Sequence, residues 1–236
     1  MVGEGAVLEA ARADAETTLA EQAARVADSG VAVTTRLVVG DPVSELIEAS
    51  QEAALLVIGS DYRGPGAGPA RGSHGIRVVA GAGCPVAVVP DVERGEHRGV
   101  VVGVDGSEVS ERAIAFAAAE ADRLQEPLIA VSVWTPVVAP RNAMMVMPED
   151  YRTGMNEQAQ GALSLSLAGL RAQHPGLEIE EHIVEGYPSA VINQFAEDAR
   201  LTVVGSRGRG AIRRFLLGSI SHEVLQRLAT VTVVVR

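Results

Sequence analysis

Short apolar stretches alternate along the chain with longer stretches in which apolar residues recur at helical spacing. Helices are expected at 108–124, 151–173, 188–199 and from 219 to about 228. Strands are expected at 98–104, 128–134, 177–184, 201–204 and 230–235. This regular alternation of strand and helix predicts a parallel sheet whose strands are joined by right-handed crossovers.

The two halves of the chain repeat each other at a constant offset of 146 residues. Val57-Ile58-Gly59-Ser60 corresponds to Val203-Val204-Gly205-Ser206, and Gly72-Ser73 corresponds to Gly218-Ser219. Nothing in the first half corresponds to residues 99–146, because Met1 falls opposite Met147. The chain is therefore interpreted as a tandem of a truncated domain, residues 1–92, and a complete domain, residues 98–236.

The first half keeps only the later elements of the repeat. The elements expected there are helices at 5–28, 42–53 and 73–82 and strands at 31–39, 54–58 and 86–89. Loss of the first two strands would leave sheet edges and apolar surface uncovered, which proteins avoid. Three explanations are considered: a second chain fills the gap, the halves repack, or the true start lies upstream of Met1. The coincidence of Met1 with an internal Met of the repeat favours the third.

Composition narrows the function. Apolar residues make up 47% of the chain and aromatic residues 3%, so the core consists of small and branched aliphatic side chains, which suit a helix-covered parallel sheet. The net charge of −10 argues against a nucleic-acid partner. All 20 basic residues are Arg. The absence of Lys excludes a Walker-type phosphate loop and Schiff-base chemistry.

The sequence also indicates a compartment. The single cysteine, Cys84, excludes an intrachain disulfide and is expected to be a buried small residue, which suits a reducing environment. No uninterrupted apolar run of membrane-spanning length and no signal peptide is recognisable, so a cytoplasmic location without membrane association is expected. The five His residues lack metal-ligand spacing, so no metal site is assigned, and His222 is interpreted as a surface helix residue.

One loop has the properties of a phosphate-binding site. The segment Gly205-Ser206-Arg207-Gly208-Arg209-Gly210 follows a buried strand, and Gly218-Ser219 opens a helix. Glycines allow a close approach of backbone amides to phosphate, and a helix N-terminus adds N–H donors and the positive end of a dipole. Further hydrogen-bond donors are the hydroxyls of Ser219 and Ser221. Positive charge comes from the guanidinium groups of Arg207 and Arg209.

These residues resemble the universal stress protein family. Its ATP-binding members carry the pattern G-2x-G-9x-G-[S/T], which Gly205, Gly208 and Gly218-Ser219 match completely. The run from Val102 to Ser107 resembles the family's first strand and turn, where the Asp contacts adenosine. The resemblance implies an open, doubly wound, five-stranded parallel α/β sheet of order 3-2-1-4-5, in tandem with a truncated copy.

The resemblance and the loop together give the expected ligand and site. The ligand is ATP, with or without Mg, and one nucleotide per chain is expected because Tyr62 replaces the middle glycine in the first half. No catalytic residue is assigned. The expected nucleotide-binding residues are Gly103, Val104, Asp105, Gly106, Ser107, Val133, Gly205, Ser206, Arg207, Gly208, Arg209, Gly210, Gly218, Ser219, Ile220 and Ser221.

Three functions are compatible with this site. The first is an ATP-binding regulatory module of a stress response, with at most weak ATP hydrolysis. The second is a slow metal-dependent ATPase or nucleotidyl transferase, in which Asp105 would hold the metal. The third is an interaction protein without a physiological nucleotide.

For Asp105 itself, an Asx turn that caps the next helix and a ligand contact are both considered. A homodimer is expected, with the last strand, ending Val233-Val234-Val235, as a candidate edge.

Overall fold

The computed structural model describes residues 4–60, 73–91, 95, 97–136, 149–208 and 217–236. By its internal contacts the chain divides into two compact units, Met1–Glu45 and Leu46–Arg236. Within the described ranges, every helix is too short or too polar to cross a membrane. Cys84 is a buried free thiol, as expected from the sequence.

The first unit contains a long helix and an extended segment. Helix α1 (Glu4–Arg25) is followed by the 3-10 turn η1 (Ala27–Ser29). The strand expected at 31–39 is wrong: these residues are exposed and belong to no strand of the described structure. Their counterparts in the repeat form β5 (Ile179–Glu185) by pairing with β4 (Leu128–Trp134), and the first half has no residues equivalent to β4. An alternating pattern becomes a strand only where a neighbour accepts and donates its backbone hydrogen bonds.

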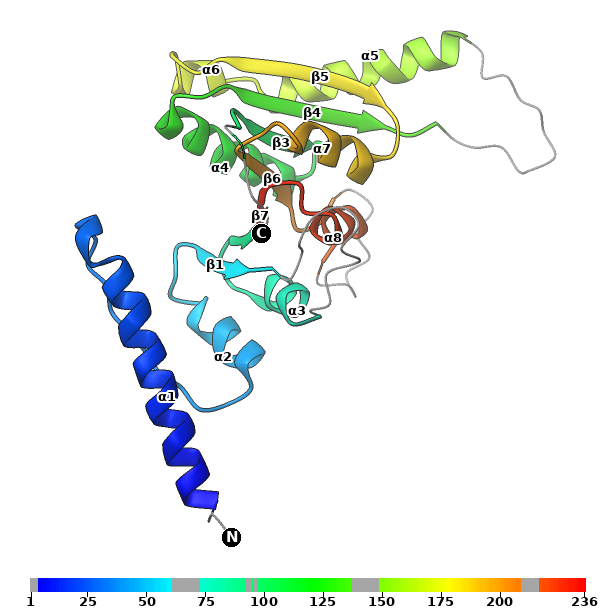
Figure 1. The fold of residues 1–236 in the computed structure, drawn as a ribbon. Helices are drawn as coiled ribbons and strands as arrows, with labels where there is room; N and C mark the ends of the chain where they lie inside the picture. The colour runs from blue at the N-terminus through cyan, green and yellow to red at the C-terminus, as the bar shows by residue number, and fades with distance from the viewer. Residues whose placement is uncertain (1–3, 61–72, 92–94, 96, 137–148, 209–216) are drawn as a thin grey trace, which may run out of the picture. The chain divides into compact units, whose positions relative to one another are not determined.

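A seven-stranded sheet forms the centre of the second unit, with the order β1-β2-β7-β6-β3-β4-β5 (Figure 1). The five strands from β7 to β5 are parallel and have the expected order 3-2-1-4-5. The remaining strands are β1 (Leu56–Gly59), β2 (Val86–Val89), β3 (Val100–Val104), β6 (Leu201–Gly205) and β7 (Val231–Val235).

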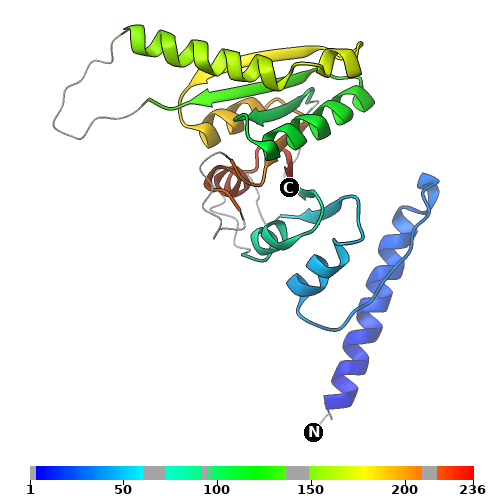
Figure 2. The ribbon, with the colours of Figure 1, turned by 180° about the vertical axis from the view of Figure 1, so that it is seen from behind.

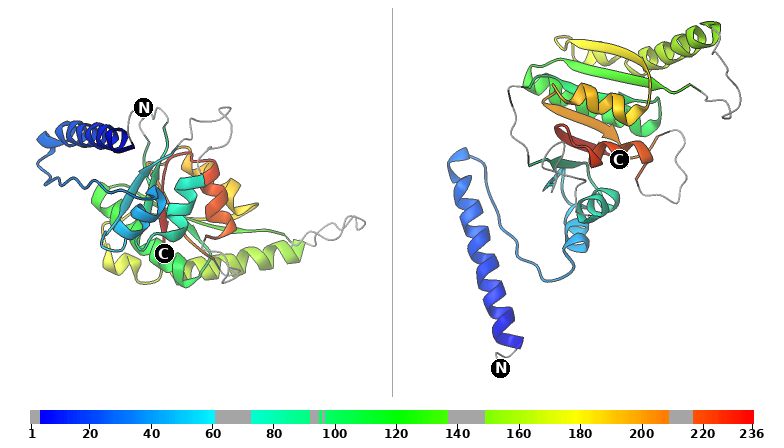
Figure 3. Two further views of the ribbon diagram at one scale, coloured as in Figure 1. Left: turned by 90° about the horizontal axis from the view of Figure 1, so that it is seen from below. Right: turned by 45° about the vertical axis from the view of Figure 1, so that its right-hand side comes forward.

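The last strand is not an edge, contrary to the expectation from the sequence. β7 lies between β6 and β2, and its pairing with β2 is antiparallel. Most apolar side chains of both strands are buried, and each strand covers the backbone edge of the other. The ends of the sheet are β1 and β5 (Figures 1 and 3). The expected homodimer stays a prediction, and β7 is not available to form it.

Helices cover both faces of the sheet. α4 and α5 pack on one face through a core that contains Ala113, Ala117 and Leu163, whereas α7 packs on the other face through Val191. The two faces are seen from opposite sides in Figures 1 and 2. The helices of this unit are α3 (Ser73–Gly81), α4 (Glu108–Leu124), α5 (Glu149–Ser166), α6 (Leu170–Gln173), α7 (Pro188–Ala196) and α8 (Ser219–Gln226). Helix α2 (Pro42–Ala49) begins in the first unit and ends in the second.

The helix expected at 151–173 is interrupted. α5 ends at Ser166 and α6 begins at Leu170, and Gly169 between them has a φ of 86°. Leu163, Leu167 and Leu170 are all buried. The break therefore lets the chain turn while its leucines stay in the core.

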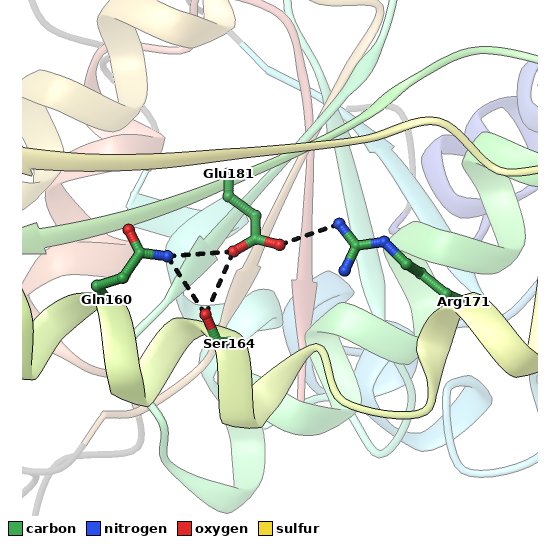
Figure 4. A network of polar contacts seen from close by, with 4 residues as sticks. All are labelled: Gln160, Ser164, Arg171 and Glu181. Carbon is green, nitrogen blue, oxygen red and sulfur yellow. Dashed lines mark hydrogen bonds and ion pairs between the residues drawn. The ribbon is translucent and has the colours of Figure 1, made fainter.

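A polar network holds α5 and α6 against β5 (Figure 4). The carboxylate of Glu181 on β5 accepts a hydrogen bond from Arg171 Nη2 at 3.1 Å and one from Gln160 Nε2 at 3.3 Å. Ser164 Oγ lies 3.3 Å from Gln160 Nε2 and 3.5 Å from the Glu181 carboxylate. Because α5 forms one wall of the cleft described below, this network helps to position that wall.

Candidate functional site

The ends of β3 and β6 lie side by side at one edge of the sheet. The two strands are parallel neighbours, with Val100 opposite Leu201 and Val102 opposite Val203. β3 also pairs with β4, so the strand order reverses at β3. A ligand of an open parallel sheet binds outside the carboxyl ends of the strands at such a reversal. A cleft of about 980 Å³ opens at this position.

Most of the residues expected from the sequence line this cleft. Ser107 and Ser206 are among those that do not, and Arg209 and Gly210 lie outside the described residues. The expected residues that line it are Gly103, Val104, Asp105, Gly106, Val133, Gly205, Arg207, Gly208, Gly218, Ser219, Ile220 and Ser221. Residues about 100 positions apart in the chain are thus brought to one site.

The turn after β3 is fixed by its own hydrogen bonds. Asp105 Oδ1 accepts the N–H of Ser107 at 3.0 Å, which is an Asx turn, and Gly106 has a φ of 71°. Ser107 Oγ caps α4 by accepting the N–H of Ser110 at 3.2 Å. Ser110 Oγ in turn accepts the N–H of Asp105 at 3.2 Å. Asp105 therefore both forms the Asx turn and lines the cleft, whereas Ser107 caps the helix.

Each glycine of the spacing motif is closely packed. A Cβ on Gly208 would collide with Asp105 Oδ2. A Cβ on Gly205 would lie 3.1 Å from Val109 Cγ1, and one on Gly218 would lie 3.2 Å from Ser206 O. None of the three has a positive φ, so limited space rather than backbone conformation disfavours a side chain here. Gly208 and the Asp105 carboxylate therefore lie close together at the cleft.

The two ends of the glycine-containing loop, at residues 205–208 and 217–219, are held together by hydrogen bonds. Gly218 N–H donates to Ser206 O at 2.7 Å, and Ser221 Oγ donates to Gly205 O at 2.5 Å. Ser206 N–H donates to Val235 O at 2.6 Å, which fixes the loop to the end of β7. The Ser206 side chain is buried. Ser206 and Ser221 therefore shape the loop, whereas Ser219 is exposed and lines the cleft at the helix start.

The start of α8 supplies donors to the cleft. Gly218 is the N-cap residue and provides no side-chain hydrogen bond to the first turn. The N–H groups of Ser219, Ile220 and Ser221 precede the first intrahelical acceptor and so point out of the helix end. These three residues line the cleft. The helix end combines donors with a partial positive charge, which favours an anion.

Arg207 places a full positive charge near the same helix end. Its side chain lines the cleft and is exposed. Burial and, to a smaller extent, the charge of Arg207 lower the pKa of Arg236 from its usual value. Arg236 itself is engaged elsewhere, since its Nη1 donates to Ala82 O at 2.6 Å. Arg207 is therefore the described cation placed to meet an anion in the cleft.

The other end of the cleft is apolar, and the sequence did not identify most of it. Val133 is accompanied by Val131 and Trp134 of β4, by Ile192 of α7 and by Met155 of α5. His222, interpreted above as a surface residue, also lines the cleft. The helical spacing of Met155, Ala159 and Ala162 could have indicated a buried face of α5, but no local signal shows that this face borders a cleft.

Gly59, the counterpart of Gly205 in the first half, lies far from this cleft. β1 runs antiparallel to β6. Gly59, at the carboxyl end of β1, therefore lies at the opposite end of the strands from Gly205. Tyr62 and Gly72 lie outside the described residues. The strand that would supply a counterpart of Asp105 has no equivalent in the first half. Within the described part of the chain, the Asp105 turn and the loop that begins at Gly205 come together at the carboxyl ends of β3 and β6.

Comparison with known proteins agrees with this geometry. The model of the Universal stress protein family matches residues 2–90 and 96–236. Universal stress protein Rv2005c from Mycobacterium tuberculosis is 36% identical over 214 residues, which cover 89% of this chain and 71% of that protein. Universal stress protein Rv1996 from the same organism is 35% identical over 221 residues, 88% of this chain and 68% of that protein.

A solved structure shows the same fold. The crystal structure of a universal stress protein from Archaeoglobus fulgidus has a TM-score of 0.66 and 22% identity, over 100% of this chain and 80% of that chain. The glycine spacing, the strand order and these matches lead to one conclusion. The chain belongs to the universal stress protein family.

Proposed function

We propose that this chain binds ATP in the cleft between Asp105 and Gly208 and acts as a regulatory binding module in a stress response. The observation that carries the proposal is the convergence of the Asp105 turn and the glycine loop on one cleft. The cleft volume of about 980 Å³ falls within the range of about 300–1,000 Å³ that small-molecule sites occupy.

The polarity of the cleft gives the orientation of the nucleotide. The phosphates would lie at the start of α8, where the backbone amides, Ser219 and Arg207 offer donors and positive charge. The adenosine would lie toward Asp105 and the apolar wall at Val133 and Trp134. A carboxylate suits ribose hydroxyl groups because it only accepts hydrogen bonds and they can donate them.

A slow metal-dependent hydrolysis or nucleotidyl transfer is the second candidate, and the place of Asp105 favours it. The Asp105 carboxylate and the Ser219 hydroxyl offer oxygen donors at the cleft, and Mg²⁺ prefers such donors together with nucleotide phosphates. Within the described residues, no group of three or more His, Cys, Asp or Glu side chains is arranged to hold a metal ion. A metal would therefore be bound chiefly through the nucleotide it accompanies.

Isothermal titration of the purified chain with ATP and MgCl₂ tests the proposal. We expect one ATP per chain and at least tenfold weaker binding by Asp105→Ala. Asp198→Ala removes an exposed carboxylate that does not line the cleft and should leave the affinity unchanged. Absence of binding by ATP, ADP and cyclic AMP would refute nucleotide binding.

Phosphate release separates the two candidates. A regulatory module should release phosphate far more slowly than the about 1–1,000 per second of typical enzymes. Release at enzymatic rates that requires Mg²⁺ and disappears in Asp105→Ala would favour the second candidate.

A further inference from the structure

A buried hydroxyl in the wall of the cleft lacks a protein partner. Ser132 of β4 is 8% exposed and lines the cleft. Among the described residues, no side chain or backbone group forms a hydrogen bond with Ser132 Oγ. A buried hydroxyl costs free energy of folding unless it forms a hydrogen bond. A ligand in the cleft is the partner to which this hydroxyl has access.

The side chains around Ser132 are small or apolar. Ser132 follows Ala130 by two residues and so lies on the face of β4 that packs with Leu163 of α5. Trp134 lies on the same face, and its Nε1–H donates to Asn156 Oδ1 at 3.1 Å. The indole therefore contributes apolar surface to the cleft rather than a donor. A polar group of a ligand at this end of the cleft has Ser132 Oγ as its contact on β4.

Gln158 reaches the same cleft from α5. The helix presents one face to the cleft, at the spacing of Met155, Gln158, Ala159 and Ala162. Gln158 is exposed, and within the described part of the chain its amide forms no hydrogen bond. The amide stands on an otherwise apolar face and offers a donor and an acceptor side by side.

We propose that Ser132 and Gln158 form a subsite for the hydrogen-bonding edge of the nucleobase and make binding depend on the amino group of adenine. The proposal rests on the nucleotide-binding function proposed above, in which the phosphates lie at the start of α8 and the base lies at the apolar end. Adenine carries an amino donor next to a ring-nitrogen acceptor, and a Gln amide can pair with both. The Ser132 hydroxyl both donates and accepts, so it can satisfy a further polar atom of the ring from the strand side.

Isothermal titration with two triphosphates tests the subsite. ATP is compared with purine riboside triphosphate, which keeps the ring, the ribose and the phosphates but lacks the amino group. The unsubstituted chain should bind ATP about two- to tenfold more tightly than the analogue, the effect of one hydrogen bond. In Gln158→Leu the affinity for ATP should fall to that for the analogue, which should itself change little. GTP is a poorer probe, because a Gln amide can rotate and pair with guanine as well.

Gln173→Leu is the matched control for the amide. Gln173 is exposed on α6 and does not line the cleft. The control variant should keep both the affinity for ATP and the preference for ATP over the analogue.

A stability measurement separates a ligand-binding role of Ser132 from a structural one. Because the hydroxyl has no described protein partner, Ser132→Ala should leave the urea midpoint of the ligand-free chain unchanged or raise it. The same substitution should raise the Kd for ATP about two- to tenfold. A lowered midpoint would assign the hydroxyl to the fold and would count against the subsite.

The outcomes distinguish this inference from the function on which it rests. Equal losses of affinity for ATP and for the analogue in Gln158→Leu overturn the subsite, and so does an unchanged affinity for ATP in both variants. In these cases nucleotide binding itself stands. Failure of the unsubstituted chain to bind either triphosphate overturns both proposals.

Discussion

Ala87 lies directly opposite Val233 in the antiparallel pair of β2 and β7. The same two residues are counterparts in the 146-residue repeat, and the flanking pairs, Val86 with Val234 and Val88 with Thr232, exchange counterparts. A local twofold axis therefore passes between Ala87 and Val233. The antiparallel pairing joins the final strands of the two halves into one sheet, and it places Gly59 and Gly205 at opposite ends of the strands.

A cysteine pair at this axis should form an intrachain disulfide. Directly opposed residues of antiparallel strands have Cβ atoms about 4.5–5.5 Å apart, close to the distance a disulfide requires. In a Cys84→Ser background, Ala87→Cys with Val233→Cys should crosslink on mild oxidation, as measured by intact mass after alkylation. Ala87→Cys with Val231→Cys is out of register and should stay reduced. Crosslinking between chains only would contradict the observed pairing.

Substitution of Gly208 should reduce nucleotide binding with little effect on folding. A Cβ at this position collides with Asp105 Oδ2, so Gly208→Val would push the phosphate loop away from the Asp105 turn. We expect at least a tenfold increase in the Kd for ATP by isothermal titration. Gly161→Ala, where nothing lies within 4 Å of the added Cβ, should bind ATP normally and gain about 0.5–1 kcal/mol of helix stability.

Substitutions of Ser219 and Ser221 by Ala should affect ATP binding and the free energy of unfolding to different extents. Ser221 Oγ donates to Gly205 O and is buried, so Ser221→Ala leaves a carbonyl without its partner and should cost about 1–3 kcal/mol in the free energy of unfolding. The exposed Ser219 should change that free energy little but weaken ATP binding when replaced by Ala. Urea denaturation and titration of both variants measure the two effects. Equal effects of the two substitutions on unfolding would be inconsistent with these roles.

The alkaline titration of Tyr187 should report its contact with Glu223. Tyr187 Oη donates to Glu223 Oε1 at 2.9 Å, and this hydrogen bond, with the negative charge of Glu223, raises the pKa of the phenol above 10.0. The folded state therefore favours the protonated phenol. The resulting stabilisation is complete below pH 10 and is lost as the pH rises through the raised pKa. The ultraviolet difference titration between the unsubstituted chain and Tyr187→Phe gives this pKa, and Glu223→Gln should lower it.

The sequence predicted most of the helices and strands in residues 98–236, because the signals for them are local. The helix at 108–124 and the strand at 128–134 have the bounds expected from periodicity. The spacing of Gly205, Gly208 and Gly218 predicted a loop that the structure places at a cleft. The break at Gly169 was not recognised, because a turn that keeps leucines buried on both sides preserves the apolar pattern of a continuous helix.

What the sequence by itself determined is therefore the repeat, the order of elements and the residue types of the loop. Only the tertiary structure decided which segments pair with a neighbouring strand. Residues 31–39 carry a strand pattern and form no strand, whereas β2 pairs with β1 of its own half and also with β7 of the other half. Only the fold brought His222, Met155 and Trp134 to the cleft wall. The reason is physical: periodicity records which face of a segment is apolar, but backbone hydrogen bonds and buried surface depend on which neighbour is present in space.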